Sequence, residues 1–497
     1  MTEADALMLA LVKGQPTWAD LLAQWADRDD PAVISTHAVW SGRELLRRAA
    51  GAADLLATLE LAPDQAVPAL LSSTPAALAL VIGGSCSGHP LAPLGPRLTP
   101  AELAPCITGL GAGVLLAEPG AAQVAADVAS RCGVRVVVVD DVPAAATPLR
   151  LDGSRSSVAF VLHTSGTSGQ PKAVPYRQDR LGVRCAVNRG LCGLGPGCRY
   201  ATASPFHHIA GLGNHAVALA AGAAVVVVPR FTVEVWQGLA EVGVTHGLTV
   251  PTMLAMLLDA DALALPQLRT LQYGAASIHP QLLARTMRAL PDAGLVNLFG
   301  MTEGSPITCL GPDDHRAAAA GRTDLLLSVG RAAPGVELRL VDIAPGGIGE
   351  VWARADHFNR ADDDEGWLHT GDLGRLDVDG YLFLAGRMGD RIVRGGENVH
   401  PLEVERVLAE HPEVADAAVV GVPDRRWGEV VKAFVVPVDP ARPPSSDGLR
   451  AFARAQLAGF KVPTAWQLVP ELPRNAAGKV LRRKLMTPSS STTGTDE

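Results

Sequence analysis

The sequence predicts an α/β fold in which helices cover both faces of a largely parallel sheet. Three valine-rich runs carry this prediction because they do not alternate apolar and polar residues, a pattern typical of strands buried on both faces. These runs span 134–141, 223–231 and 244–251. Stretches with helical periodicity alternate with them, at 41–59, 121–132, 234–242 and 280–290. Alternating strands and helices indicate a layered α/β architecture.

Beyond about residue 320 the pattern changes to short strands separated by Gly, Pro and Asp turns. The segments "GVELRLVD", "GEVWARA" and "GYLFLAGR" indicate a small antiparallel or barrel-like subdomain. Residues 401–411 open with a proline and are amphipathic, which predicts a helix. Two strands are expected after it, at 417–424 and 430–437. The polar stretch 487–497 cannot bury a core and is expected to be a frayed tail.

The composition is that of a packed globular protein. A chain of 497 residues is expected to form more than one domain. Apolar residues make up 48% of the chain and charged residues 19%, which argues against disorder. The net charge of −8 provides no basic field, so we expect no nucleic-acid partner.

Three features bear on the location of the protein. The 7 cysteines show no C-x-x-C spacing, which favours reduced thiols in the cytoplasm over disulfides or a zinc ribbon. The N-terminus lacks a cationic start before its apolar stretch, so we expect no signal peptide. Residues 211–229 approach the length of a membrane span, but Asn214 and His215 interrupt them and Gly222 divides them. We expect a helix followed by a buried strand there, and no membrane span.

One loop has the residue types of a phosphate-binding site. "FVLHTSGTSGQPKAV" (160–174) follows a strand-like run with glycines, hydroxyl side chains and one lysine, Lys172. Glycines allow successive backbone N–H groups to turn toward one anion, and the hydroxyls and lysine add donors and charge. The loop is not a Walker A motif, because Pro171 precedes the lysine and Ala173 follows it. A Ser/Gly-rich surface loop is the alternative.

Three further polar residues suit nucleotide chemistry. Asp372 lies in a Thr-Gly-Asp turn, where a carboxylate can accept from two vicinal hydroxyls such as those of a ribose. Glu303 follows Thr302, and together they offer hard oxygen ligands for Mg²⁺. Lys479 follows Gly478 in a polar turn. Taken singly, each has a plainer interpretation as a turn cap, a surface charge or a solvated lysine.

Taken together, the motifs resemble those of the adenylate-forming enzyme superfamily, which includes acyl-CoA and aryl-CoA synthetases, the amino-acid-activating domains of peptide synthetases, and luciferase. The matching segments are "TSGTSGQPK", "FGMTE", "HTGDL", "GRMGDRIVRGGENVHP" and "PRNAAGKVLRRKL", in the family's order. The resemblance is strong over about 155–486. It implies a large N-terminal domain of two layered α/β sheets plus the barrel-like subdomain at 1–388, a small mobile α+β lid domain at 389–486, and the tail at 487–497.

The family couples a carboxylic acid to a thiol. The carboxylate attacks the α-phosphate of ATP, giving acyl-AMP and pyrophosphate, and a thiol, usually that of coenzyme A, then displaces AMP. The resemblance therefore implies ATP, Mg²⁺ and coenzyme A as cofactors. It implies that Lys479 bridges the carboxylate and the α-phosphate, that Thr302 contacts the α-phosphate, and that Glu303 binds the magnesium.

The resemblance also assigns the nucleotide contacts. The loop would hold the β- and γ-phosphates through Thr164, Ser165, Gly166, Thr167, Ser168, Gly169 and Lys172. Gly274, Ala275, Ala276 and Phe299 would flank the adenine, and Asn297, Gly300 and Met301 are also implied to bind the nucleotide. Asp372 and Arg387 would hold the ribose hydroxyls.

The segment "SPFHHIAGLGNH" (204–215) is implied to wall the acyl pocket, with His207, His208 and Gly211 as pocket or gate residues. A metal site of His207, His208 and His215 is the rival interpretation, disfavoured because no Cys, Asp or Glu partner is near. Amino-acid-activating members usually carry an aspartate in this segment, and none is present, so an α-amino acid substrate is disfavoured. The stretches that form the pocket are rich in Gly and Ala and leave room, which favours a bulky or medium-length apolar acid as the substrate.

The lid carries two further assignments. The resemblance implies a hinge at Gly389, where the family usually has Asp or Lys. Glycine has no side chain that could stabilise either conformation of the lid. The thiol tunnel is implied to include Gly395, Gly396 and Glu397.

The acceptor remains open between coenzyme A and the phosphopantetheine of a separate carrier protein. Four basic residues could meet the 3′-phosphate of coenzyme A: Arg425, Arg426, Lys461 and Arg482. A non-catalytic binding protein on the same fold is a third possibility, and a homodimer is left open.

Overall fold

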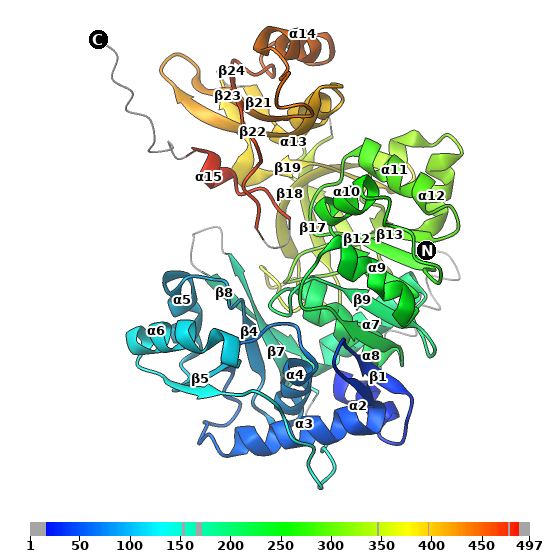
Figure 1. The fold of residues 1–497 in the computed structure, drawn as a ribbon. Helices are drawn as coiled ribbons and strands as arrows, with labels where there is room; N and C mark the ends of the chain where they lie inside the picture. The colour runs from blue at the N-terminus through cyan, green and yellow to red at the C-terminus, as the bar shows by residue number, and fades with distance from the viewer. Residues whose placement is uncertain are drawn as a thin grey trace. The chain divides into compact units, whose positions relative to one another are not determined.

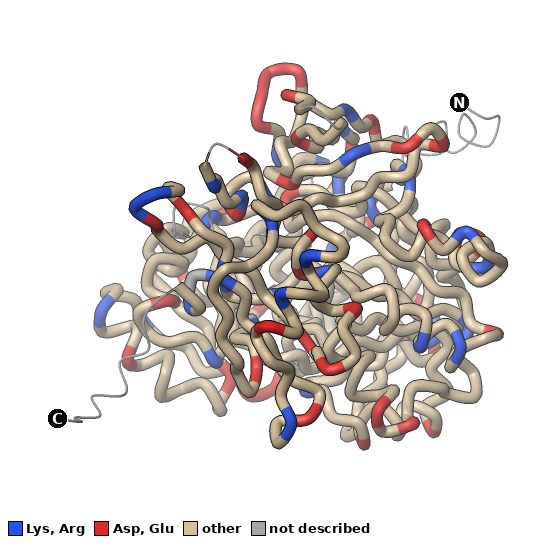
Figure 2. Tube along the Cα trace, turned by 90° about the horizontal axis from the view of Figure 1, so that it is seen from above, with Lys and Arg blue, Asp and Glu red and all other residues tan. Residues whose placement is uncertain are grey.

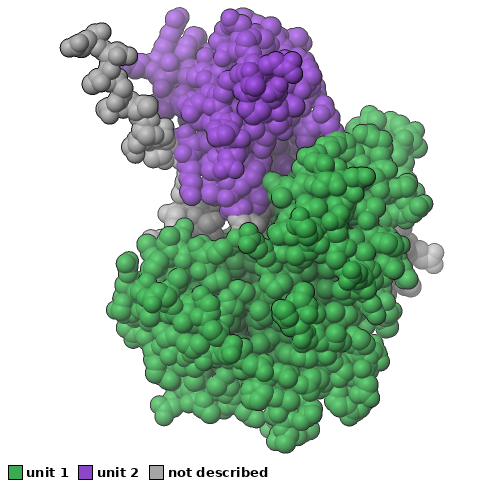
Figure 3. All heavy atoms as spheres, in the orientation of Figure 1, with its two compact units in different colours: residues 1–275, 282–338, 353–368 green, residues 276–281, 339–352, 369–497 purple. Residues whose placement is uncertain are grey.

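The structure is a computed structural model that describes residues 16–151, 155–165, 171–344, 347–395, 397–475 and 478–486. The chain divides into two compact units. Unit 1 comprises 1–275, 282–338 and 353–368, and unit 2 comprises 276–281, 339–352 and 369–497 (Figure 3). The predicted tail at 487–497 and the loop residues 166–170 lie outside the described residues.

Unit 1 contains a six-stranded sheet of order β6-β5-β3-β4-β7-β8 (Figure 1). Its strands are β3 (Val67–Leu70), β4 (Leu91–Leu94), β5 (Val114–Ala117), β6 (Arg135–Val138), β7 (Val158–Ser165) and β8 (Pro171–Arg177). The first five run parallel, and β8 returns antiparallel to β7. Helices α5 (Pro100–Leu110) and α6 (Ala122–Cys132) pack on one face through a cluster that includes Leu103, Ile107 and Val128.

A second, nine-stranded sheet has the order β15-β14-β13-β12-β11-β9-β10-β1-β2. Its strands are β1 (Pro31–Ile34), β2 (Val39–Ser41), β9 (Arg199–Thr202), β10 (Ala224–Val227), β11 (His246–Thr249), β12 (Thr270–Gly274), β13 (Gly294–Phe299), β14 (Thr308–Leu310) and β15 (Arg331–Ala332). The central strands are parallel, whereas β2 pairs antiparallel with β1, β14 with β13 and β15 with β14. One hydrophobic core joins the two sheets, with residues such as Val67 and Leu116 of the first and Tyr200, Val225 and Val296 of the second.

The helices of unit 1 include α2 (Trp18–Leu22), α3 (Gly42–Ala57), α4 (Pro75–Ser87), α7 (Gln178–Cys192), α8 (Asn214–Ala220), α9 (Val233–Val242), α10 (Pro251–Asp259) and α12 (Pro312–Ala319). Helix α11 (Pro280–Ala289) begins in unit 2 and continues into unit 1. Several begin at a threonine N-cap, and Thr99 forms a capping box with Glu102 at the start of α5. The helices predicted at 41–59, 121–132, 234–242 and 280–290 are confirmed as α3, α6, α9 and α11.

Two of the three valine-rich runs behave as predicted. Strands β10 and β11 are buried at every position. The prediction is wrong for the run at 134–141, because β6 is exposed or half-buried throughout. It is the outermost strand of its sheet, so it has a neighbour on one side only. The 211–229 stretch is the helix α8 followed by the buried strand β10, as expected. In the described part of the chain, no helix combines the length and apolarity needed to cross a bilayer.

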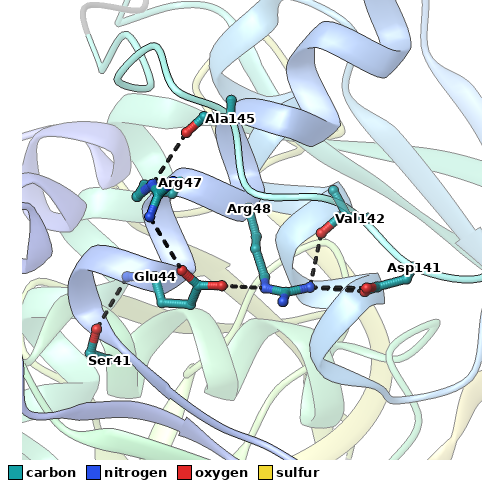
Figure 4. Close-up of polar contacts among 7 residues, drawn as sticks. All are labelled: Ser41, Glu44, Arg47, Arg48, Asp141, Val142 and Ala145. Carbon is teal, nitrogen blue, oxygen red and sulfur yellow. Dashed lines mark hydrogen bonds and ion pairs between the residues drawn. The ribbon is translucent and has the colours of Figure 1, made fainter.

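Polar contacts tie helix α3 to the segment that follows β6 (Figure 4). Ser41 caps the helix by accepting from the Glu44 N–H at 3.2 Å. Arg48 contacts Glu44 at 2.7 Å and Asp141 at 3.0 Å, and it also donates to the carbonyl oxygen of Val142. These contacts draw the segment so close to the helix that a Cβ on Gly51 would lie 1.9 Å from the Pro143 carbonyl oxygen.

The substitution Gly51→Ala should therefore lower the free energy of unfolding by about 1–3 kcal/mol, since the backbone of the facing segment must shift. Urea unfolding measures the change. Gly109→Ala on α5 is the matched control, because a Cβ there meets nothing within 4 Å. It should stabilise the protein by about 0.5–1 kcal/mol through helix propensity. Equal effects of the two substitutions would contradict the close approach.

Unit 2 contains most of a four-stranded sheet and all of a five-stranded one. The first has the order β16-β17-β18-β19, from β16 (Glu337–Val341), β17 (Gly349–Arg354), β18 (Leu368–Leu376) and β19 (Leu382–Arg387). The second has the order β21-β20-β23-β22 with β24 beside β23, from β20 (Ile392–Arg394), β21 (Glu397–Val399), β22 (Val414–Asp424), β23 (Gly428–Pro437) and β24 (Ala465–Leu468). Helices α13 (Pro401–Ala409), α14 (Ser446–Gln456) and α15 (Arg482–Met486) complete the unit. The helix predicted at 401–411 and the strands at 417–424 and 430–437 are confirmed.

Basic and acidic residues are interspersed along the chain (Figure 2). This mixing accompanies the net charge of −8. Taken together, the sheets and helices of the two units make this a mixed α/β protein, as the sequence predicts.

Candidate active site

The predicted phosphate loop connects strands β7 and β8. These strands pair antiparallel, and the last pairs before the loop are Thr164 with Lys172 and Ser165 with Pro171. Gly166, Thr167, Ser168 and Gly169 lie outside the described residues. Lys172 is exposed at the start of β8, so its ammonium group is available to a ligand held by the loop. The register places Thr164 and Lys172 at the same end of the hairpin.

Glu303 is brought to this hairpin from a distant part of the sequence. It is buried, with 5% of its surface exposed, and the Thr164 hydroxyl donates to its Oε1 at 3.3 Å. Arg360 lies 3.9 Å from the same oxygen. The carbonyl oxygens of Thr302 and Glu303 accept from the Tyr176 hydroxyl and the Asn359 N–H, respectively, which fixes the turn. One buried carboxylate beside a hydroxyl fits Mg²⁺, which commonly takes one or two carboxylates plus substrate phosphates.

The predicted adenine-side residues of unit 1 gather where parallel strands β12 and β13 end. Gly274 pairs with Leu298, and the Asn297 side-chain amide donates to the Tyr273 carbonyl oxygen at 3.3 Å. The carboxyl ends of adjacent parallel strands are where α/β sheets bind ligands. Phe299 ends β13, and Gly300, Met301 and Thr302 follow it directly.

Two backbone features shape this edge. Ala275 has φ +65°, a conformation that costs free energy for a residue with a Cβ and is found most often at functional sites. Gly300 leaves no room for a side chain, because a Cβ would lie 2.9 Å from the Gly304 carbonyl oxygen. Ala276 belongs to unit 2.

The two histidines of the predicted acyl gate are neighbours in space. Their rings lie 4.2 Å apart at an angle of 48°. Burial, the neighbouring His208 and the charge of Arg97 lower the pKa of His207 to about 3, and burial lowers the pKa of His208. Both rings are therefore neutral at pH 7. The buried Nδ1 of His207 and Nε2 of His208 have no hydrogen-bond partner in the structure.

Gly211 and His215 complete the segment. Gly211 is required by a close approach, since a Cβ there would lie 2.1 Å from the Pro205 carbonyl oxygen. The fully buried His215 packs its ring 5.0 Å from that of Phe206, and its Nδ1 lies 2.9 Å from the Gly211 carbonyl oxygen. Among the residues that the structure describes, no group of three or more His, Cys, Asp or Glu side chains is arranged to hold a metal ion.

In unit 2, Asp372 and Arg387 form an ion pair across strands β18 and β19. The two residues are direct partners in the ladder, and Arg387 Nε lies 3.0 Å from Asp372 Oδ1. Asp372 is 7% exposed. Its burial raises the pKa of its carboxyl group, while the charges of Arg387 and Lys479 act against that rise.

Lys479 lies on a short turn in the same unit. Its N–H donates to the Asn475 side chain and its carbonyl oxygen accepts from the Asn475 N–H, both at 2.9 Å. Gly478, just before it, has φ +79°, which favours glycine. Desolvation of the ammonium group and the positive charge of Arg387 lower the pKa of Lys479, and Asp372 opposes them. The structure thus brings Lys479 within electrostatic reach of the Asp372–Arg387 pair, although the residue as a whole stays exposed.

The predicted hinge and thiol residues are also in unit 2. Gly389 lies in the 3₁₀ turn η5 (Met388–Asp390), and a Cβ there would meet nothing within 4 Å. The N–H of Gly395, at φ +61°, donates to the Trp427 carbonyl oxygen at 2.7 Å, and a Cβ on it would lie 2.8 Å from the Trp427 ring. Gly396 lies outside the described residues, and Glu397 begins β21.

Sequence reasoning missed several residues that the structure places in these clusters: Tyr176, Arg360 and Trp427. Each lies outside the recognised motifs and acts through a contact distant in sequence. Two of the four basic residues considered for coenzyme A are engaged elsewhere, since Lys461 pairs with Glu403 at 2.6 Å and Arg482 with Glu405 at 2.5 Å. Arg425 and Arg426 remain exposed beside Trp427.

Comparisons with known proteins identify the family of the chain. Residues 22–360 match the model of the AMP-binding enzyme family, and 403–479 match the C-terminal domain of AMP-binding enzymes. The chain is 32% identical over 487 residues to the fatty acid–[acyl-carrier-protein] ligase ScoC of Streptomyces coeruleorubidus, which covers 92% of each chain. It is 33% identical over 463 residues to a feruloyl-CoA synthase of Amycolatopsis, covering 88% of this chain and 92% of that one.

A solved structure agrees as well. The amide bond synthetase McbA from Marinactinospora thermotolerans superposes with a TM-score of 0.85 at 30% identity, covering 94% of this chain and 98% of that one. The three relatives share an adenylating fold and differ in their named acceptor or product. Because the family model spans well over half of the chain, this protein belongs to the AMP-binding family of adenylate-forming ligases.

Proposed function

We propose that this protein activates a carboxylic acid with ATP to an acyl-adenylate, releasing pyrophosphate, and then transfers the acyl group to the thiol of coenzyme A. The acid is a bulky or medium-chain apolar one and not an α-amino acid. Relatives that are acyl- and aryl-CoA ligases support the two-step activation. The contacts within each unit support the residue roles proposed below.

The ion pair of the buried Asp372 with Arg387, two residues whose charges act on Lys479, is the observation that carries the proposal. In ATP the ribose is bonded directly to the α-phosphate. A carboxylate that accepts from the ribose hydroxyls therefore sets the α-phosphate nearby, where the Lys479 ammonium group can meet it. There the lysine would offset the negative charge of the attacking carboxylate and of the α-phosphate as the new bond forms.

Unit 1 would supply the contacts to the rest of the triphosphate. Lys172 and the loop that begins at Thr164 hold the β- and γ-phosphates, and Glu303 would hold a magnesium ion. Bound there, the ion would neutralise phosphate charge. Thr302 lies next to this carboxylate and contacts the α-phosphate. Their turn is held by Tyr176 and Asn359, so the Thr302 hydroxyl and the Glu303 carboxylate are in place before ATP binds.

The gate histidines favour an uncharged acyl group. Neutral rings at His207 and His208 offer hydrogen bonds without a net charge. The following residues, Ile209 and Ala210, are apolar and half-buried. Residues 204–215 contain no carboxylate that could pair with a substrate ammonium group.

Trp427 and the arginines around it favour coenzyme A as the acceptor. Trp427 is 43% exposed and covers Gly395, and Arg426 lies 5.1 Å from its ring centroid. Arg394 lies 6.0 Å from the same centroid. An exposed indole with flanking guanidinium groups suits an adenine ring and its phosphates. Loading of a carrier protein is the second candidate, and the ScoC relative favours it.

A panel of carboxylic acids tests the first step. Acid-dependent exchange of pyrophosphate into ATP should occur with apolar acids and not with α-amino acids. Thioester formation should then follow with coenzyme A alone. Exchange without any coenzyme A thioester, together with loading of a phosphopantetheinylated carrier, would establish the second candidate instead. No exchange with any acid would overturn both.

The acceptor assignment gives a separate prediction. Arg426→Ala should raise the KM for coenzyme A about three- to tenfold and weaken its dependence on salt, because one charge-assisted contact to phosphate is lost. Steady-state kinetics at two salt concentrations measure this. Arg450→Ala is the control, since Arg450 pairs with Asp447 on α14. A KM unchanged in both variants would contradict the assignment.

A further inference from the structure

Helix α7 carries a buried arginine, Arg184, that joins two distant segments of unit 1. The residue is 3% exposed, and each nitrogen of its guanidinium group donates to a neutral oxygen. The acceptors are the carbonyl oxygens of Ser305 and Gly213, at 3.1 and 2.7 Å, and the side-chain oxygen of Asn214, at 3.0 Å. Burying a charge is costly unless hydrogen bonds compensate it, and three charge-assisted bonds do so here. Arg184 is therefore held firmly to all three acceptors.

Two of the acceptors belong to the segment proposed to wall the acyl pocket. Residues Ile209–Gly213 form η3, a π-helical turn that runs directly into α8 at Asn214. Such turns are rare and are found frequently at functional sites. Gly213 ends the turn, and its carbonyl oxygen accepts from Arg184 Nη1. The Asn214 side chain accepts from Nη2 and donates to the Ala210 carbonyl oxygen at 3.2 Å. Arg184 thus holds the end of the turn directly and Ala210 through Asn214.

The π-helical turn is packed closely around this contact. A Cβ on Gly213 would lie 2.2 Å from Ile209 Cδ1 and 3.2 Å from Arg184 Nη1, so the two side chains enclose the glycine. Ile209 and Ala210 are half-buried apolar residues that directly follow the gate histidines. Because interiors are packed to high density, a displacement of the Arg184 contacts would be transmitted to these two residues.

The third acceptor lies just after the turn that bears Glu303. Arg184 Nε donates to the Ser305 carbonyl oxygen there. Tyr176 and Asn359 hold that turn by contacts of their own. Loss of Arg184 should therefore displace the π-helical turn and leave Glu303 in its place.

We propose that Arg184 is a positioning residue, which fixes the distance between the acyl-pocket segment and the turn that bears Glu303, and thereby selects among acids. The carboxylate of the acid must reach the α-phosphate, so this distance decides which acyl groups fit behind a correctly placed carboxylate. The inference deepens the proposed function and rests on its assignment of residues 204–215 to the acyl pocket. It adds to acid selection a buried arginine that lies outside this segment.

Pyrophosphate exchange by Arg184→Met with straight-chain acids from butanoic to dodecanoic, and with benzoic and cinnamic acids, tests the proposal. The KM for the best acid should rise about tenfold and the KM for ATP should change less than about twofold, since a small shift of the acyl segment leaves the phosphate contacts in place. The ranking of the acids by kcat/KM should flatten. Arg184→Lys should recover only part of the KM, because an ammonium group lacks the planar fork that reaches three acceptors. Arg189→Met is the matched control, since Arg189 is exposed on the same helix.

Asn214→Ala removes one acceptor and its link to Ala210 while Arg184 stays. It should raise the KM for the acid in the same direction. The double variant of Arg184→Met with Asn214→Ala should raise that KM no further than the worse single substitution, because both act through one contact. If Arg184→Met fails to fold, Asn214→Ala and Arg184→Lys decide.

An equal rise in the KM for ATP and for the acid would indicate a general loss of structure and overturn the proposal. A wild-type KM and ranking, or multiplying effects in the double variant, would overturn it as well. Hydrogen exchange gives a readout without activity: amides of 209–215 should exchange faster in Arg184→Met than in Arg189→Met, and those of 299–303 should not. Equal changes in both segments, or none, would overturn the proposal. A wild type with no pyrophosphate exchange for any acid would instead refute the proposed function.

Discussion

Replacing Lys479 with alanine should lower the rate of acyl-adenylate formation by about a hundred- to a thousandfold. The lysine would supply the cation where negative charge gathers as the carboxylate attacks the α-phosphate, and loss of one such donor typically has an effect of this size. The charges of Asp372 and Arg387 both act on its ammonium group. Acid-dependent pyrophosphate exchange measures the change.

The second half-reaction distinguishes this role from a general loss of structure. Thioester formation from supplied acyl-adenylate should remain within about twofold of the wild-type rate, because the acyl–phosphate bond is already formed and the thiol then displaces AMP at the carbonyl carbon. Lys484→Ala is the matched control, since Lys484 is exposed on α15 in the same segment. Equal losses in both half-reactions of the Lys479 variant would show that its role is misassigned.

The second large effect is expected for Asp372→Asn. The asparagine keeps one acceptor oxygen, so about one charge-assisted hydrogen bond to a ribose hydroxyl is lost. Such a bond contributes about 1.5–3 kcal/mol, and the KM for ATP should rise about ten- to a hundredfold. Burial raises the pKa of Asp372, and a protonated carboxyl group is a poorer acceptor. The wild-type KM for ATP should therefore rise as the pH falls through that raised pKa, and the KM of the asparagine variant should not follow it.

The substrate 2′-deoxy-ATP isolates the ribose contact. The wild type should bind ATP more tightly than 2′-deoxy-ATP, and Asp372→Asn should remove most of that difference. Arg387, whose Nε lies 3.0 Å from Asp372 Oδ1, is present in both proteins. Loss of the ion pair alone therefore does not predict a change in the preference for ATP over 2′-deoxy-ATP. If Asp372→Asn still preferred ATP over 2′-deoxy-ATP by the wild-type factor, the ribose would not bind at Asp372.

Local patterns were sufficient to predict most of the elements. The buried strands β10 and β11 follow from their valine-rich runs, and the helix periodicity locates α3 and α9. The same pattern fails for β6, because position within a sheet is decided by the topology and not by the run itself. Whether such a strand is central or at an edge depends on residues distant in the sequence.

The site was predictable only where residues cluster in the sequence. Thr302 and Glu303 are adjacent in one motif, whereas Tyr176 and Arg360 reach that turn from separate segments. Since Lys and Arg total 43 and six are lysines, arginines number 37, and a single arginine outside a motif carries no signal. The contacts of Arg184 and the exposure of Trp427 likewise emerge only from the fold.

The central claim is that Lys172, Glu303 and Asp372 bind a single ATP molecule. A crystal structure of the protein with ATP and Mg²⁺ tests it most directly. It should place Lys172 and the Glu303-bound magnesium on the β- and γ-phosphates and Asp372 on the ribose hydroxyls of the same nucleotide. An ATP molecule that contacts only one of these groups, with the others out of reach, would contradict the account.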